Sequence, residues 1–211
     1  MKNKKIFCLI VLGIMGCSEP QNQTTDSALD SIQLPDQNAV EPQIEQRRVY
    51  EDMPNDDTQT INIVLNKAMD DPKFMYDFEQ KLAKNHFKLS KKSEDRTWST
   101  NDCERNQIIK ITGFGVYHYA ASSQVGIGQN KDYYPDFNMT ILSFDTEQEA
   151  IQQFKGLASS VNYQQFCNGK SPEKMLQKGR YIIYLNTRAE LFRTYINRYA
   201  DFIEQYKGMV K

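Results

Sequence analysis

Two stretches of the chain share one layout, and together they constrain its fold more than any other feature. They read ILSFDTEQEAIQQF at 141–154 and IIYLNTRAELFRTY at 182–195, and each passes from an apolar run to Thr-x-x-Glu. A short apolar run is consistent with a buried strand, and Thr-x-x-Glu ahead of a helical apolar repeat is a capping box. Thr146 and Thr187 are therefore expected to cap two helices. The chain is predicted to hold two strand–capping box–helix units near its C-terminal end.

The spacing of apolar residues predicts the remaining elements of the domain. The expected order is helices over 58–69 and from Pro72 to about Lys84, strands over 96–100, 107–119 and 136–144, the first capped helix, a strand ending at Asn186 and the second capped helix. Gly113 and Gly115 suggest a bulge or bend within 107–119. This order favours an α+β fold in which helices pack on a mainly antiparallel sheet.

The N-terminal residues have the pattern of an export signal. A basic start, Met1–Lys5, precedes the apolar run Ile6–Met15, which is the secretory-signal order. The run is too short to span a membrane, since a spanning helix needs about 20 apolar residues. The tetrapeptide Ile14-Met15-Gly16-Cys17 resembles the lipobox of bacterial lipoproteins. The alternative is an ordinary cleaved signal whose flanking cysteine has no such role.

The resemblance to bacterial lipoproteins implies how the protein reaches and holds a membrane. It implies that residues 1–16 are a signal peptide and that Cys17 becomes an acylated N-terminus, where two or more acyl chains give stable anchoring. The first partner would then be the lipid bilayer of the bacterial cell envelope. Ser18 stands where aspartate would favour the inner membrane, so the outer membrane is the more consistent location. The resemblance ends at Ser18 and identifies no domain family.

Composition changes sharply after the cysteine. Between Ser18 and Asp57 there are ten acidic residues, two arginines, no glycine and one aromatic residue. Such a segment buries too little apolar surface to offset the entropy of ordering, so we expect 17–57 to be a lipidated, disordered acidic tether. Residues 58–211 carry 21 basic and 17 acidic residues and are long enough for one domain with its own core. Nucleic acid is not an expected partner of an exported chain with so little excess charge.

The cysteines suggest one disulfide bond. Of the four, Cys8 lies in the signal and Cys17 is the lipid site, which leaves Cys103 and Cys167. Two remaining thiols in an exported domain most simply pair with each other. Neither belongs to a Cys-x-x-Cys motif, and a zinc site would need more ligands than lie nearby. We therefore predict a structural disulfide and neither a metal nor a cofactor.

Motifs that carry catalysis are not found in the sequence. The two histidines, His86 and His118, lack the spacing of a metal site. Combining His118 with Ser122 or Ser123 and Asp132 would give a Ser–His–Asp set, but no nucleophile motif surrounds these serines. The sequence also has no Walker or G-x-G-x-x-G phosphate loop. The domain is therefore not expected to be an enzyme.

One stretch, VYHYAASSQVGIGQNKDYYPDF at 116–137, suggests recognition. It concentrates aromatic residues around a glycine-containing loop, and tyrosine offers a large contact area with few rotatable bonds. The hypothesis is a partner-binding surface made by Tyr117, His118, Tyr119, Tyr133 and Tyr134. The alternative is that these side chains pack on the two faces of a sheet.

The sequence therefore favours a membrane-anchored envelope lipoprotein with a non-catalytic protein-binding domain. Its partner would be another envelope protein, bound in the manner of an assembly accessory or an inhibitor or immunity protein. A carrier of a small apolar ligand, held between helices and sheet, is the first alternative. A cell-wall or glycan hydrolase is the second, and it would have to use loop carboxylates such as Asp132 and Asp136.

Overall fold

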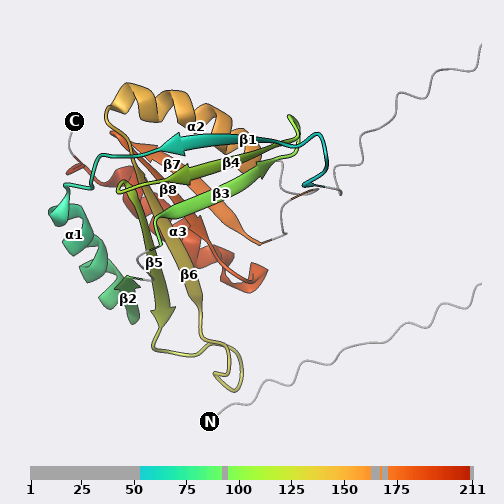
Figure 1. Ribbon diagram of the computed structural model, residues 1–211. Coiled ribbons are helices and arrows are strands. Elements are labelled where there is room, and N and C mark those ends of the chain that lie inside the picture. Colours follow the sequence, from blue (N-terminus) through green and yellow to red (C-terminus); the bar gives the residue numbers. More distant parts are fainter. Residues whose placement is uncertain (1–52, 92–94, 163–166, 168–170, 210–211) are drawn as a thin grey trace, which may run out of the picture. The chain divides into compact units, whose positions relative to one another are not determined.

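The computed structural model describes residues 53–91, 95–162, 167 and 171–209. The predicted signal peptide, Cys17 and most of the predicted tether lie outside the described residues. Within them the chain forms an α+β domain with two sheets and helices on both faces of the larger one (Figure 1). The predicted fold class is confirmed.

The larger sheet is antiparallel and has five strands in the order β2-β5-β6-β8-β7. Its strands are β2 (Phe87–Lys91), β5 (Val116–Ser123), β6 (Asp136–Ser143), β7 (Glu173–Lys178) and β8 (Tyr181–Asn186). The smaller sheet has the order β1-β4-β3, with β1 parallel and β3 antiparallel to β4. Its strands are β1 (Gln59–Val64), β3 (Thr97–Asp102) and β4 (Gln107–Thr112). The helices are α1 (Pro72–Ala83), α2 (Glu147–Asn162), the short 3-10 helix η1 (Glu190–Phe192) and α3 (Arg193–Gln205).

Alternation along β8 shows how the layers are arranged. Tyr181 and Ile183 belong to a core shared with α1 and α3, whereas Ile182 and Tyr184 belong to a core shared with α2 and the smaller sheet. Because successive side chains of a strand point to opposite faces, the larger sheet is covered on both sides. In Figure 1 the smaller sheet lies in front of β7 and β8, and α3 lies behind them.

The core under α1 and α3 is filled by aromatic rings. Phe137 stacks on Tyr199 with 5.0 Å between ring centroids, and the rings of Phe87 and Phe78 meet Tyr199 edge-on at 5.6 and 5.8 Å. All four side chains are buried, with at most 4% exposed. Burial of each such ring stabilises the fold by about 1.5–3 kcal/mol, so the four rings contribute substantially to the core that α1 and α3 share with the sheet.

Two predicted helix starts are confirmed by their capping bonds. Asp71 Oδ1 accepts a hydrogen bond from the Phe74 N–H at 2.8 Å and begins α1, with Pro72 in the first turn. Thr146 Oγ1 accepts from the Glu149 N–H at 3.2 Å and begins α2. After β8 the chain again enters a helix, but Thr187 has another role. It is buried, and its hydroxyl donates to the Asp136 carbonyl oxygen at 2.6 Å, so η1 precedes α3 without a side-chain cap.

The predicted strand over 107–119 is two strands in different sheets. Gly113 has φ +110°, and a Cβ there would lie 2.4 Å from the Leu65 carbonyl oxygen; a Cβ on Gly115 would lie 2.6 Å from the Ser143 carbonyl oxygen. A side chain at position 113 or 115 would collide with this backbone, so both positions need glycine. The chain passes from β4 into β5 through these two residues. We call residues 112–116 the glycine corner.

Other differences concern edge strands and one helix. The helix predicted over 58–69 is wrong, because β1 occupies this region and pairs with the isoleucine-rich β4. Ile61, Ile63 and Leu65 fit a strand repeat, and pairing with β4 selects the strand. The helix was predicted from another set with helical spacing, namely Ile61, Val64, Leu65, Ala68 and Met69. Strands β2 and β7 were not predicted, since both are short edge strands with charged residues. None of the helices in the described ranges has the length and apolar character needed to cross a membrane.

The predicted disulfide is present between Cys103 and Cys167, whose Cα atoms are 5.9 Å apart. It joins the turn after β3 to the segment that follows α2. The bridge closes a loop with a sequence separation of 64 residues, which in the chain-entropy model stabilises the fold by about 4 kcal/mol.

Candidate functional site

The five residues of the predicted binding surface do not lie on one face of the protein. Tyr117 and Tyr119 point from β5 toward the helices and pack against the α1/α3 core. The Tyr117 hydroxyl accepts a hydrogen bond from the Met69 N–H at 3.0 Å, and burial raises the pKa of Tyr119. For these two tyrosines the packing alternative describes the structure.

His118 lies between the two sheets. It occupies the opposite face of β5, with Nδ1 3.0 Å from Thr140 Oγ1 and Nε2 3.0 Å from the Thr97 carbonyl oxygen. Since both ring nitrogens have partners, His118 fastens β5 and β6 to β3. Its geometry does not include Ser122, Ser123 or Asp132, so the Ser–His–Asp arrangement is not formed.

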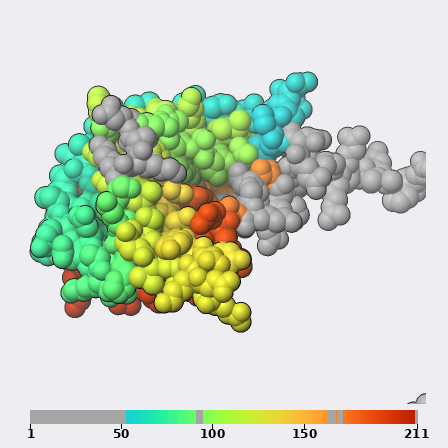
Figure 2. All heavy atoms as spheres, turned by 90° about the horizontal axis from the view of Figure 1, so that it is seen from below, coloured from blue at the N-terminus to red at the C-terminus, as the bar shows by residue number. Residues whose placement is uncertain are grey.

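Tyr133 and Tyr134 have a different environment, because they stand on the connection between β5 and β6. This connection, Gln124–Pro135, is called here the β5–β6 loop. Tyr133 is 59% exposed, Tyr134 52% and Val125 47%. Figure 2 shows the loop in yellow as a projecting part of the surface, with orange-red residues of the C-terminal third beside it. Three large apolar side chains are therefore presented to solvent by a single loop.

Hydrogen bonds fix the backbone of the β5–β6 loop. The Ile127 N–H donates to the Tyr133 carbonyl oxygen at 2.7 Å, and the Tyr133 N–H donates back at 3.3 Å. Ser123 Oγ donates to the Val125 carbonyl oxygen at 2.8 Å and accepts from the Val125 N–H at 3.1 Å. A Cβ on Gly126 would lie 1.9 Å from the Lys131 carbonyl oxygen. The loop is a compact element of its own rather than an open connection.

Arg188 joins this loop to the start of the C-terminal helices. Its Nε lies 3.0 Å from Asp136 Oδ2, and its Nη2 donates to the Tyr134 carbonyl oxygen at 3.3 Å. The guanidinium also lies 5.5 Å above the Phe192 ring. Next to Phe192 in η1, Leu191 is 57% exposed. Asp136, one of the carboxylates of the hydrolase hypothesis, is thus held in an ion pair with Arg188.

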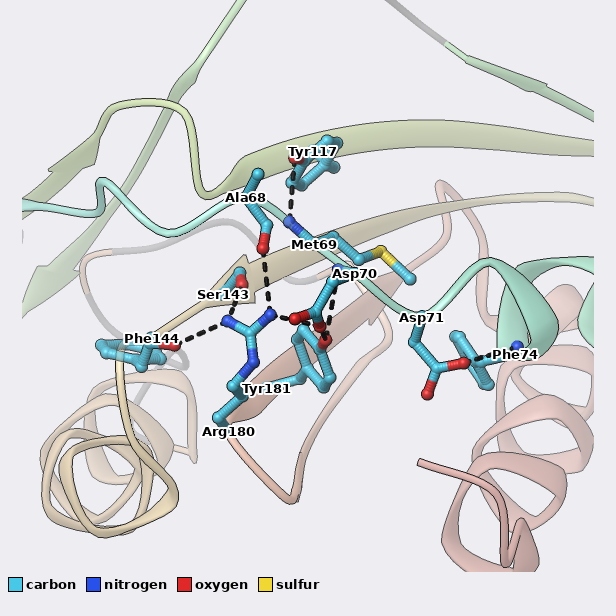
Figure 3. Close-up of polar contacts among 10 residues, drawn as sticks. All are labelled: Ala68, Met69, Asp70, Asp71, Phe74, Tyr117, Ser143, Phe144, Arg180 and Tyr181. Carbon is cyan, nitrogen blue, oxygen red and sulfur yellow. Dashed lines mark hydrogen bonds and ion pairs between the residues drawn. The ribbon is translucent and has the colours of Figure 1, made fainter. Parts of the chain in front are cut away.

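A second polar cluster, not predicted from the sequence, lies where the connector from β1 to α1 crosses the larger sheet (Figure 3). The Arg180 guanidinium donates to four acceptors, and Tyr181 shares one of them. The acceptors are Ser143 Oγ at 2.7 Å, the Phe144 and Ala68 carbonyl oxygens at 2.8 and 3.0 Å, and Asp70 Oδ1 at 2.5 Å. The Tyr181 hydroxyl donates to Asp70 Oδ1 at 2.6 Å.

The pKa shifts in this cluster indicate a structural role and not a catalytic one. The hydrogen bond from Tyr181, followed by that from Arg180, lowers the pKa of Asp70 below its ordinary 3.8. Burial, followed by the bond to Asp70, raises the pKa of Tyr181 to about 12. At neutral pH the carboxylate is therefore ionised and the phenol is neutral, so neither group is suited to acid–base catalysis near pH 7.

The described residues contain no group of three or more histidine, cysteine, aspartate or glutamate side chains that could hold a metal ion. The feature of the structure that most resembles a functional site is therefore the β5–β6 loop. Sequence reasoning found Tyr133 and Tyr134 but did not identify Val125 or Leu191. Comparison with models of known protein families, with curated proteins and with solved structures finds no match to this chain.

Proposed function

We propose that this chain is a lipid-anchored bacterial envelope protein whose domain binds another envelope protein without catalysis. The anchor would be acylated Cys17, and the outer membrane is the favoured location. The observation that carries the proposal is the exposure of Val125, Tyr133 and Tyr134 on a loop whose backbone is already hydrogen-bonded.

Preorganisation is the physical reason for choosing this loop. Binding costs free energy when a loop and its side chains must be ordered, and a loop that is already fixed avoids much of this cost. Tyrosine adds large contact area and a hydroxyl with few rotors to immobilise, which is why it is frequent at binding hot spots. An assembly accessory and an inhibitor or immunity protein are both consistent with such a surface.

The packing of the domain favours protein binding over the two alternatives. A small apolar ligand held between helices and sheet would need the space that Phe78, Phe87, Phe137 and Tyr199 fill. A hydrolase would need a free pair of carboxylates, and Asp136 is engaged by Arg188. An apolar molecule that co-purifies with the protein in native mass spectrometry would support the carrier instead.

The test compares partner capture by matched variants of the full, lipidated chain in native membranes. Tyr133→Ala with Tyr134→Ala should abolish recovery of the partner, because the exposed rings supply most of the proposed contact. The melting temperature should fall by less than about 3 °C, since exposed side chains contribute little to folding.

Tyr76→Ala is the matched control. Tyr76 is a 62% exposed tyrosine on α1, outside the β5–β6 loop, so its removal should leave capture unchanged. Equal capture by the double variant and the wild type would reject the loop as the binding surface.

A further inference from the structure

The four edge strands of the two sheets differ in how they are protected. In the larger sheet, β2 carries Lys88 and Lys91, and β7 carries Glu173, Lys174 and Lys178. In the smaller sheet, β3 packs against α2. Charged residues and covering elements are the usual protection of an edge against pairing with another strand. Among the edges that the structure describes, β1 has neither kind of protection.

The sequence of β1 and its flanks suits strand pairing. Residues 58–66 read TQTINIVLN and contain no charged residue, proline or glycine. Ile61 is 40% exposed and Val64 61%, and Thr60 and Asn62 are also exposed. An exposed, neutral edge rich in β-branched residues is a template for a further strand.

The pairing of β1 with β4 determines which backbone groups are available. The Gln59 N–H donates to the Asn106 carbonyl oxygen and the Leu65 N–H to that of Thr112, so odd-numbered residues of β1 bond to β4. In a parallel pair the intervening residues direct their N–H and C=O groups away from the neighbour. Thr60, Asn62 and Val64 therefore present their backbone groups to the open edge.

We propose that β1 pairs antiparallel with β1 of a second copy of this chain. A two-fold axis at Asn62 places Asn62 opposite Asn62 and Thr60 opposite Val64, and all of these residues have outward backbone groups. Three residue pairs would then each exchange two main-chain hydrogen bonds. The result is one continuous sheet of six strands, β3-β4-β1-β1-β4-β3.

Self-complementarity is the reason for choosing a second copy as the occupant. In this register Ile61 faces Ile63 on the side of the core, and two Asn62 amides, each a donor and an acceptor, face each other on the other side. The neutral segment 58–66 places no like charges opposite each other. Because contact is confined to one edge, the association is expected to be weak. Neither the proposed lipid anchor nor the β5–β6 loop takes part in this pairing.

Cysteine cross-linking of the full chain tests the geometry. In the proposed dimer the two Asn62 Cα atoms lie about 5.5 Å apart, within the range that a disulfide spans. Asn62→Cys should give a disulfide-linked dimer of twice the monomer mass under mild oxidation. Lys110→Cys is the matched control, because Lys110 is the exposed β4 residue in register with Asn62. Its two copies would lie about 14 Å apart, so it should stay monomeric.

The outcomes of this experiment separate the possible occupants. Equal cross-linking of both variants, or cross-linking of neither, would overturn the proposal. A cross-linked product of Asn62→Cys with the mass of a different protein would also overturn it, because the edge would then accept a foreign strand.

Variants with opposite charges at position 62 distinguish pairing between two copies from a role of Asn62 within one copy. Asn62→Asp and Asn62→Lys each place like charges opposite each other at the two-fold axis, so each variant alone should lose the dimer that the wild type forms. An equal mixture should regain it, because Asp then faces Lys. A mixture that stays monomeric, or a wild type that sediments as a monomer at the same concentration, would contradict self-pairing.

Discussion

At the scale of single residues, Arg180 explains how the connector between β1 and α1 is held. Only 12% of its side chain is exposed, and a guanidinium stays charged at physiological pH, so burial requires partners for its N–H groups. Two backbone carbonyls, a serine hydroxyl and the Asp70 carboxylate supply them. The same carboxylate accepts a hydrogen bond from the Tyr181 hydroxyl. The side chains of Arg180, Tyr181 and Asp70 therefore fix the connector between β1 and α1.

The sign of the Asp70 shift gives a pH prediction. Its pKa in the folded state lies below 3.8, so its ionised form stabilises the fold above about pH 3.8, and this contribution is lost as the pH falls through the folded pKa. Tyr181→Phe removes the largest cause of the shift. We expect the Asp70 pKa to rise toward 3.8 in this variant, as measured by NMR titration of the carboxyl carbon.

Tyr117→Phe is the control for this titration. The Tyr117 hydroxyl bonds to the neighbouring Met69 N–H rather than to Asp70, so the Asp70 pKa should stay where it is in the wild type. An unchanged pKa in Tyr181→Phe would show that the hydrogen bond does not stabilise the carboxylate.

The sequence predicted part of the candidate site, and the rest depended on contacts far apart in the chain. Tyr133 and Tyr134 belong to the aromatic stretch around a glycine-containing loop that predicts recognition, and in the structure both are exposed. Tyr117 and Tyr119 look the same in sequence, but strand alternation turns them toward the helices. Arg180 gave no signal, since its partner Asp70 lies 110 residues away.

At the scale of elements, the glycine corner decides that β4 and β5 belong to different sheets. The chain passes so close to Leu65 and Ser143 that neither Gly113 nor Gly115 has room for a side chain. Phe114 between them is 65% exposed and carries no such constraint. The two sheets are therefore joined through backbone that cannot be substituted without moving its neighbours.

Two glycine-to-alanine changes should have opposite effects on stability. Gly115→Ala forces a Cβ against the Ser143 carbonyl oxygen and should destabilise the fold by about 1–3 kcal/mol. Gly156→Ala lies within α2, where a Cβ meets nothing within 4 Å, and should stabilise it by about 0.5–1 kcal/mol. Urea unfolding of both variants measures the difference. A Gly115→Ala protein as stable as the wild type would contradict the crowding at the corner.

Elements with local signals were predicted, and the strands that were missed, β1, β2 and β7, are edge strands that depend on pairing. Asp71-Pro72 and Thr146 begin helices through bonds to residues three positions away, so short sequence patterns are sufficient. The apolar spacing of β1 fits two periods, and only the β4 ladder selects the strand. Thr187 also follows the capping pattern, but its buried hydroxyl donates to the carbonyl oxygen of Asp136, which lies in a strand 51 residues earlier in the chain.

At the scale of the whole molecule, the proposed anchor and the described domain depend on different residues. The domain holds its cores and its disulfide within residues 53–209, whereas the proposed anchor depends on Cys17 alone. Loss of the acyl group should therefore change where the protein is found and leave its fold intact.

Cys17→Ala should move the protein from the membrane fraction to the soluble fraction and remove metabolic labelling by fatty acid. The physical reason is that acyl chains supply the bilayer affinity of such an anchor. Cys8→Ala is the control, because it leaves an apolar residue within the same apolar run and should keep both the label and the membrane location. A Cys17→Ala protein that stays fully membrane-bound would contradict the lipoprotein assignment.

The place of β8 in the larger sheet has a consequence for how the chain is made. β8 lies between β6 and β7, yet it comes from residues 181–186, late in synthesis. Until residues 180–199 have been made, β6 pairs with β5 alone, Asp70 lacks Arg180, and Phe78 of α1 lacks Tyr199. Because such long-range contacts form slowly and together, the nascent chain should remain open until its C-terminal part has been made. An open chain of this kind is the form that the proposed export would require.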